Sequence, residues 1–141
     1  MSERLVLALV PDLMFATQID SVVERLGYAP AFANDADSLL MQARAERPVL
    51  VLLDLAARGV DVPVAIQRLK ADATTRDLPV IAFGPHLDAA ARAAAQAAGA
   101  DAVVANSKLA FDLPGLLARY AEGRDPPPPA PLPSEGKGEP V

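Results

Sequence analysis

Asp54 follows an apolar run, residues 49–53, that is typical of a buried parallel strand. Parallel strands direct their carboxyl ends into the crevice in which open α/β sheets bind ligands. We therefore expect the Asp54 carboxylate in such a crevice. There it can accept a phosphoryl group, help to bind a cation, or simply accept backbone N–H bonds at the strand end.

Two further titratable groups are expected near the same crevice. Asp12 comes just after the first apolar run, residues 5–10. It can contribute an oxygen ligand to Mg²⁺ together with Asp54, but its place before a helical pattern favours a role as helix N-cap. His86 follows the apolar run of residues 80–83. We interpret it as a loop or cap residue, with a role as ligand or hydrogen-bond donor as the alternative.

The elements that must position these groups alternate along the chain. Five apolar runs predict strands at residues 5–10, 28–33, 49–53, 80–83 and 102–105. Between and after them, patterns of helical spacing predict helices at residues 13–26, after a cap at Asn34 or Asp35, at residues 64–71, at residues 89–98 after Asp88, and after a cap at Asp112 with Pro114 in the first turn.

Strict alternation of strands and helices indicates right-handed crossovers and a parallel sheet that is covered on both faces. The predicted fold class is α/β: a three-layer, flavodoxin-like, doubly wound sheet of five parallel strands in the order 2-1-3-4-5, with five helices. Its switch point lies beside the first and third strands, which places Asp12 and Asp54 together. Gly27 is expected to end the first helix with a positive φ.

Composition excludes several classes of function. The 141 residues contain no cysteine and a single histidine, which excludes disulfides, a Cys nucleophile and a His-based metal cluster within one chain. The net charge of −5 disfavours nucleic acid and anionic membranes as partners. No Gly-rich phosphate fingerprint or catalytic triad is present, so an ordinary metabolic enzyme is not expected. A cytoplasmic protein without a signal peptide or membrane span is expected.

Three stretches in this order resemble the receiver domain of two-component response regulators. The phosphoacceptor strand is similar to residues 49–55, the following helix, loop and strand are similar to residues 68–82, and the turn before the fifth strand is similar to residues 97–101. The resemblance covers residues 4–121. It implies a role in phosphorelay signal transduction, with Asp54 at the phosphoacceptor position.

Other positions of the family's site fall on residues of different chemistry. The acidic pair that normally holds Mg²⁺ falls on Val10 and Pro11, the hydroxyl residue on Gly84, the lysine on Asn106 and the aromatic switch residue on Val103. Asp12 and Lys108 lie one and two residues beyond the positions of a missing acid and of the missing lysine. Phosphoryl transfer to a carboxylate needs a cation to neutralise the developing charge. The resemblance with these departures implies a degenerate receiver, or pseudo-receiver.

Two hypotheses of function remain open. The first is a stand-alone signalling module, not an enzyme, that acts through protein–protein contacts and needs no cofactor. Its partner is a histidine kinase or an effector, and its surface is the family's usual output face, formed by the last two helices and the last strand. The alternative is a conventional phospho-receiver, with Mg²⁺ at Asp12 and Asp54. A small-molecule binding module is a third, weaker idea.

The end of the chain differs in composition from the rest. Seven of the 14 prolines fall within residues 124–141. Proline lacks a backbone donor, and this segment has little apolar surface to bury. We predict a receiver-like domain at residues 1–122 and a proline-rich, disordered tail at residues 123–141. A proline-rich ligand for a partner is the alternative reading of the tail.

Overall fold

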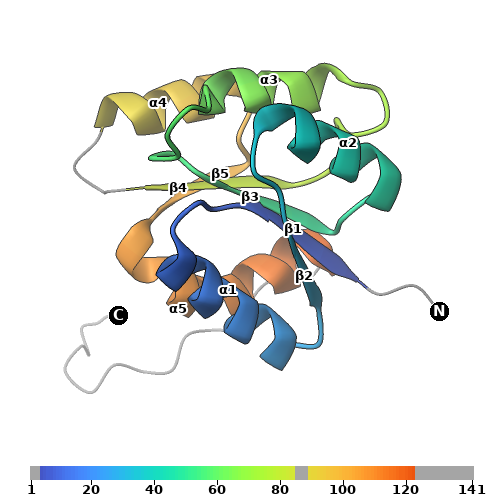
Figure 1. Cartoon of the computed structure of the whole chain (residues 1–141), viewed down its shortest axis with the longest axis vertical. Coiled ribbons are helices and arrows are strands. Elements are labelled where there is room, and N and C mark those ends of the chain that lie inside the picture. Colours follow the sequence, from blue (N-terminus) through green and yellow to red (C-terminus); the bar gives the residue numbers. More distant parts are fainter. Residues whose placement is uncertain (1–3, 85–88, 123–141) are drawn as a thin grey trace.

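The computed structural model describes residues 4–84 and 89–122, and these form one α/β sheet structure (Figure 1). The elements in chain order are β1 (Leu5–Leu9), α1 (Leu13–Arg25), β2 (Ala29–Phe32), α2 (Ala36–Glu46), β3 (Leu50–Asp54), α3 (Val62–Ala71), β4 (Val80–Gly84), α4 (Ala89–Ala98), β5 (Ala102–Ala105), α5 (Asn106–Leu116) and the π-helical turn η1 (Leu117–Ala121). The predicted tail and His86, Pro85 and Asp88 lie outside the described residues.

The five strands are all parallel and run in the order β2-β1-β3-β4-β5, which confirms the predicted topology. Helices α2, α3 and α4 cover one face of the sheet, and α1 and α5 cover the other (Figure 1). Each face has its own apolar cluster, centred on Leu53 and Ile66 on one side and on Leu52 and Phe83 on the other. Every residue of β3 and β4 is buried, as continuous apolar strands in the middle of a parallel sheet require.

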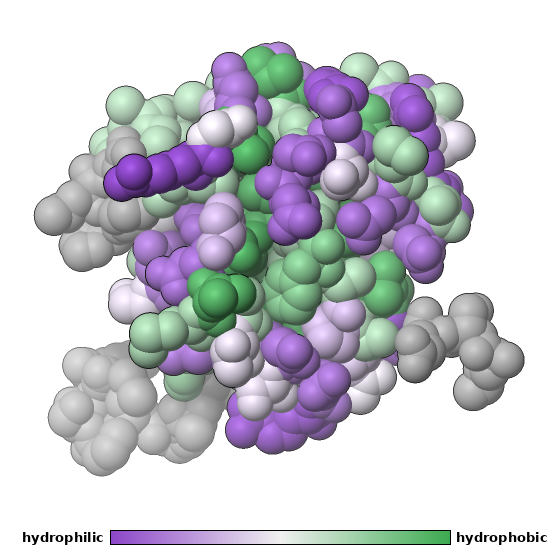
Figure 2. All heavy atoms as spheres, viewed as in Figure 1, coloured by the Kyte–Doolittle hydropathy of each residue, from purple (hydrophilic) through white to green (hydrophobic). Residues whose placement is uncertain are grey.

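The surface of the molecule follows the same layering. In the space-filling view, hydrophilic side chains cover much of the helical layers, and hydrophobic residues are visible between the layers (Figure 2). No helix within the described ranges is long and apolar enough to cross a membrane.

Most helix starts agree with the sequence analysis. Asp12 caps α1, because one of its carboxylate oxygens accepts the backbone N–H groups of Met14 and Phe15 at 2.9 and 3.1 Å. Of the two candidates for α2, Asp35 is the cap, and it accepts the N–H of Ser38 at 2.8 Å. Gly27 follows α1 with φ +90°, a conformation that costs glycine little.

The predicted start of the last helix was wrong. Helix α5 begins at Asn106, directly after β5, without a side-chain cap, and Asp112 lies inside it. Pro114 is also an interior residue, although an interior proline costs about 3 kcal/mol. Leu109, Leu113 and Leu117 recur every four residues and are all at least 98% buried. The burial of this apolar row outweighs the loss of one helical hydrogen bond at Pro114.

The two ends of the described chain meet at the amino edge of the sheet. Arg4 donates to the Ala121 carbonyl at 3.0 Å and its guanidinium lies 5.0 Å from the centre of the Tyr28 ring. The Tyr28 hydroxyl donates to Glu122. These contacts fix the end of η1 against the starts of β1 and β2, at the opposite edge of the sheet from Asp54.

Candidate functional site

Asp54 is the last residue of β3 and lies at the carboxyl edge of the sheet, as predicted. It is 8% exposed, and its Oδ1 accepts the backbone N–H of Ala56 at 2.8 Å. Burial raises the pKa of the Asp54 carboxyl above its ordinary value, and the negative charge of Asp12 raises it further, while the Ala56 hydrogen bond acts in the opposite direction. Burial is the largest cause of this pKa shift and Asp12 the smallest, since the Asp12 carboxylate is exposed and its charge is screened by solvent.

No cation compensates this pair within the described part of the chain. The four ion pairs found there are Arg4–Glu122, Arg44–Asp72, Arg68–Asp37 and Lys70–Asp101, and none includes Asp12 or Asp54. Asn106, where the resemblance predicts the family's lysine, lines a hollow of about 290 Å³ together with Asp12, Met14, Phe15 and Gln18. Its Oδ1 is buried and has no hydrogen-bond partner among the described residues. A neutral amide cannot replace the charge of an ammonium group.

Gly84, where the resemblance predicts the family's hydroxyl residue, is closely packed by Leu55. A Cβ placed on Gly84 would lie 3.0 Å from Leu55 Cβ and 3.1 Å from Leu55 Cδ1. Leu55 is held there because its N–H donates to the Phe83 carbonyl at 2.8 Å. A serine or threonine at this position would require Leu55 to move by a few tenths of an ångström. The glycine therefore belongs to a packed arrangement and does not leave an open space for a side chain.

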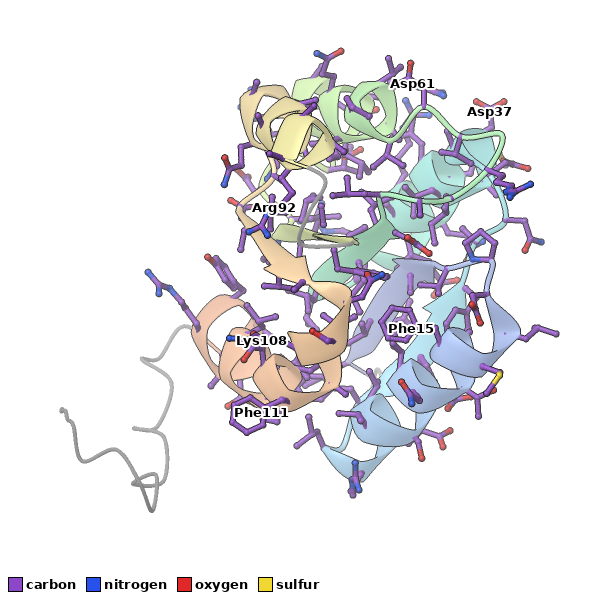
Figure 3. All side chains as sticks on the ribbon, turned by 90° about the vertical axis from the view of Figure 1, so that its left-hand side faces the viewer. Phe15, Asp37, Asp61, Arg92, Lys108 and Phe111 are labelled. Atoms are coloured by element: carbon purple, nitrogen blue, oxygen red, sulfur yellow. The ribbon has the colours of Figure 1, made fainter. Side chains whose placement is uncertain are left out.

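An aromatic contact covers the same region from the α1 side. The ring of Phe15 meets the ring of Phe83 edge to face, with centroids 5.2 Å apart and an interplanar angle of 81°. Phe83 is fully buried and pairs with Asp54 across the β3–β4 ladder. Figure 3 shows Phe15 between α1 and the sheet. The residues placed next to Asp54 are thus Phe83 on the adjacent strand, Ala56, and Asp12 as a neighbouring charge.

Leu55 and Phe15 are not among the predicted site residues, although both pack next to strand ends at this edge of the sheet. Leu55 follows Asp54 directly. The only signal in the sequence was that a large residue at position 55 occurs together with a glycine at position 84, which leaves room for it. Phe15 belongs to the apolar face of α1, and nothing in its spacing distinguishes it from an ordinary core residue. Both contacts join elements that are remote in sequence.

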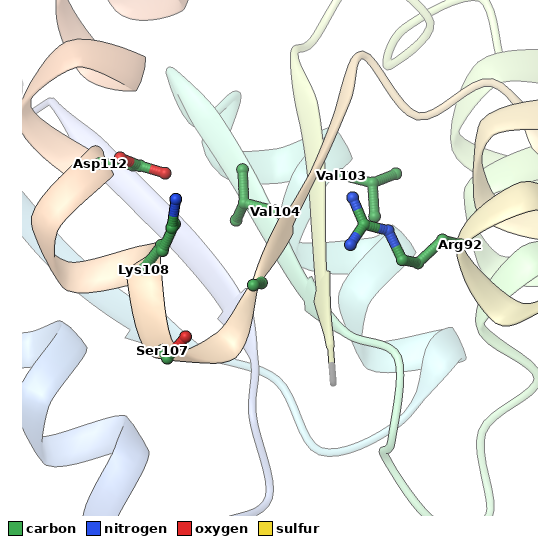
Figure 4. Close-up of a pocket in the computed structure, with 7 residues that line it drawn as sticks. Arg92, Val103, Val104, Ser107, Lys108 and Asp112 are labelled. Atoms are coloured by element: carbon green, nitrogen blue, oxygen red, sulfur yellow. The ribbon is translucent and has the colours of Figure 1, made fainter. Parts of the chain in front are cut away.

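The last strand and its flanking helices form a second, separate hollow. It has a volume of about 510 Å³ and is lined by Arg92, Val103, Val104, Ala105, Ser107, Lys108 and Asp112. Lys108 therefore faces this hollow and makes no ion pair with Asp54 (Figure 4). Val103, where the resemblance predicts the family's aromatic switch residue, lines this hollow as well.

Comparison with known structures gives the fold. The receiver domain of a sensor histidine kinase from Pseudomonas aeruginosa superposes on this chain with a TM-score of 0.77 and is 21% identical in sequence. The superposition covers 86% of this chain and 99% of that domain. The chain has the receiver fold. The signal receiver domain of a histidine kinase from Syntrophus aciditrophicus (TM-score 0.77, 18% identity) covers 94% of this chain and 99% of its own. The receiver domain of NtrX from Brucella abortus (TM-score 0.74, 21% identity) covers 84% and 99%.

Sequence-based comparisons add nothing to this result, because no family model and no curated protein matches the chain. The likeness is thus one of receiver architecture at low identity. It extends over nearly the whole of each receiver domain compared, so the β2-β1-β3-β4-β5 sheet and its five helices account for the match.

The Pseudomonas domain holds a magnesium ion in its active-site cleft. The candidate oxygen ligands of the present chain can be compared with the coordination that this ion requires. Mg²⁺ requires near-octahedral oxygen ligation. Val10 is a buried hydrocarbon, Pro11 has no side-chain oxygen, and one oxygen of Asp12 is engaged in capping α1. No group of three or more acidic or histidine side chains within the described ranges is arranged to hold a metal. These residues do not fit the ion well.

Proposed function

We propose that this receiver fold serves as a signalling module that works by protein–protein contact and not by Mg²⁺-dependent phosphorylation of Asp54. One observation carries the proposal: the Asp54 carboxylate is buried, and no described cation forms an ion pair with it or with Asp12. An incoming phosphoryl group would add negative charge to these carboxylates. Without an electrostatic partner, that charge is not stabilised during transfer.

The packing of Gly84 and Asn106 supports the same proposal. In the receiver family a hydroxyl and a lysine at these positions contact the phosphoryl group, as the resemblance implies. Here the first position is occupied by Leu55 packing against a glycine, and the second offers a neutral amide. Val103 carries no ring that could report phosphorylation by a rotamer change. The state of Asp54 therefore has no evident route to the rest of the molecule.

The proposed contact surface is the face formed by α4, β5 and α5. It carries a cationic side chain from each helix, Arg92 and Lys108, around the hollow of about 510 Å³. Figure 3 shows both side chains on the same side of the molecule. Receiver domains associate with histidine kinases and effector proteins, so we propose a partner of one of these classes.

The test is a phosphorylation assay by intact mass. The protein is incubated with Mg²⁺ and acetyl phosphate beside a conventional receiver domain as positive control. We expect less than a tenth of the adduct that the control forms. Asn106→Lys, which restores a cation, is expected to raise the yield if charge is the missing factor. A stoichiometric adduct that disappears in Asp54→Asn would contradict the proposal.

A second candidate, a conventional phospho-receiver, is favoured by the position of Asp54 alone. It predicts Mg²⁺ binding at Asp12 and Asp54. Calorimetric titration with Mg²⁺ distinguishes the two candidates, because the conventional receiver must give a binding signal that Asp54→Asn removes. The contact module must give the same null signal for both proteins.

A further inference from the structure

The two edge strands of the sheet differ in whether a further strand can add to them. On β2, Ala29 and Ala33 donate their N–H groups to Arg4 and Ala8 at 2.8 and 2.9 Å. Alternation along the strand turns the backbone of Pro30 to the outer edge, where proline has no N–H to offer. Proline at this place protects an edge strand from pairing with another chain.

The outer edge of β5 has no such protection. Val51 of β3 and Leu55, the residue after β3, donate to the carbonyls of Pro79 and Phe83. Alternate residues of β4, beginning with Val80, therefore turn their backbone groups toward β5. The register pairs Ile81 with Ala102. The backbone groups of Ala102 and Val104 therefore face β4, and those of Val103 and Ala105 face outward. Within the described sheet, β5 pairs with β4 alone.

The free edge borders the hollow between α4 and α5 and is flanked by positive charge. Arg92 extends from α4 and Lys108 from α5, on the two sides of β5 (Figure 4). Neither takes part in an ion pair within the described residues. Asp112, one helical turn after Lys108, also lines the hollow. The charged residues of the hollow, Arg92, Lys108 and Asp112, therefore carry a net charge of +1, in a chain whose net charge is −5.

We propose that β5 accepts an extended, acidic segment of a partner protein as a sixth strand of the sheet. Strand addition supplies affinity through main-chain hydrogen bonds, here with Val103 and the N–H of Ala105. Carboxylates of the segment meet Arg92 and Lys108, which supplies the selection for acidic sequences. Because Asp112 weakens the field at Lys108, Arg92 makes the larger contribution. This inference rests on the proposed function and names the binding mode and the chemistry of the partner.

Two other occupants of the edge fit less well. The proline-rich end of this chain has prolines at 126–129, 131 and 133, which cannot donate to a ladder, and its remaining acidic stretch contains two glycines, which are poor strand formers. A second copy of the chain, paired through β5, would bring its own Arg92 and Lys108 along the same seam, and like charges would oppose the contact.

The test is a ¹H–¹⁵N NMR titration of the full chain at low salt. The probe is a blocked seven-residue peptide of alternating glutamate and threonine, and the matched control replaces each glutamate by lysine. We expect the acidic peptide to shift the amide signals of Val103 and Ala105 and to slow their hydrogen exchange, with no change at Phe32 on the opposite edge. N-methylation of alternate amides of the peptide should abolish the shifts.

Variants separate the two parts of the proposal. Val103→Pro removes the outward N–H and should weaken peptide binding at least tenfold. Arg92→Ala and Lys108→Ala should also weaken peptide binding, Arg92→Ala by the larger factor. Because Val103→Pro can also disturb the fold, the alanine variants provide the independent check. Equal shifts with the lysine peptide, shifts confined to the Asp54 crevice, or a concentration-dependent dimer that shows the same β5 shifts would each overturn the proposal.

The outcome of the peptide titration does not depend on the outcome of the phosphorylation assay. A stoichiometric phosphoryl adduct, together with intact peptide binding, would overturn the phosphorylation-independent function and support the β5 site. Absence of any β5 shift at millimolar peptide, together with absence of an adduct, would overturn the β5 site alone.

Discussion

The Asp54 crevice and the face around β5 are neighbouring regions with opposite properties. In the crevice the buried Asp54 carboxylate has the like charge of the exposed Asp12 near it, and Leu55–Gly84 and Phe15–Phe83 contacts lie on neighbouring elements. Around β5 two cations without ion-pair partners in the described chain border an open hollow and an unpaired strand edge. The two regions therefore differ in charge and packing: the first is anionic with closely packed neighbours, and the second carries cations beside a strand edge. Four predictions test this difference, and they are ordered by the expected effect on stability.

The largest effect is expected for Gly84→Thr. The new Cβ would lie about 3.0 Å from Leu55 Cβ, closer than carbon atoms normally approach. Overpacking of this kind costs about 1–3 kcal/mol, which urea denaturation would measure. A double-mutant cycle with Leu55→Ala should recover part of the loss, because the smaller side chain removes the clash. If Gly84→Thr is as stable as the parent protein, the crevice is not closed in the way described.

The next effect concerns Phe15→Ala. Loss of the edge-to-face pair with Phe83 removes about 0.5–1.5 kcal/mol in addition to the lost burial of the ring. We expect a total loss of about 1–2 kcal/mol in the free energy of unfolding. Met14→Ala is the matched control, since Met14 is the neighbouring residue and is 83% exposed. Equal effects of the two substitutions would show that Phe15 does not support the crevice.

A smaller effect of opposite sign is expected for Asp54→Asn. The pKa of Asp54 is raised in the folded state above its ordinary value of 3.8, so the folded protein binds more protons than the unfolded chain between these two pKa values. Stability therefore falls as the pH rises through this window, and at pH 7 the charged carboxylate is unfavourable.

Asparagine lacks this charge and keeps an oxygen acceptor for the Ala56 N–H. We expect a rise of less than about 4 °C in the melting temperature at pH 7, and no rise below pH 3.8. Asp54→Ala, which loses the acceptor as well, is the control. A fall in melting temperature for Asp54→Asn at pH 7 would show that the carboxylate has a favourable partner after all.

The smallest effect on stability is expected on the β5 face. Arg92→Glu and Lys108→Glu change charges that make no ion pairs in the described chain, so each should alter the free energy of unfolding by less than about 0.5 kcal/mol. The same variants should lose binding to the acidic peptide. Denaturation curves and peptide titrations on the same samples would show this separation, and a large loss of stability would contradict it.

The parts of the fold that depend on local sequence could be predicted. Continuous apolar runs define buried parallel strands, and Asp12 before an apolar helical pattern indicates a cap. Helix α5 could not be placed correctly, because the preference of Pro114 for a first turn is local, whereas the burial of Leu109 and Leu113 depends on tertiary packing.

The site was predictable only in part for the same reason. Sequence placed Asp54 and Asp12 at one edge of the sheet, because both follow apolar runs of a parallel sheet. The contact between Leu55 and Gly84, and the approach of Arg92 and Lys108 to β5, depend on how separate elements pack. No spacing of residues along the chain encodes such contacts.

The contacts of Arg4, Tyr28 and Glu122 have a practical consequence for engineering. They bring the first and last described residues together at the amino edge of the sheet, as adjacent termini do in domains that tolerate circular permutation. A short linker between these ends would allow new termini to be opened in another loop, such as the one at Gly59. Fluorophores attached there would report on the Asp54 side of the molecule without altering β5.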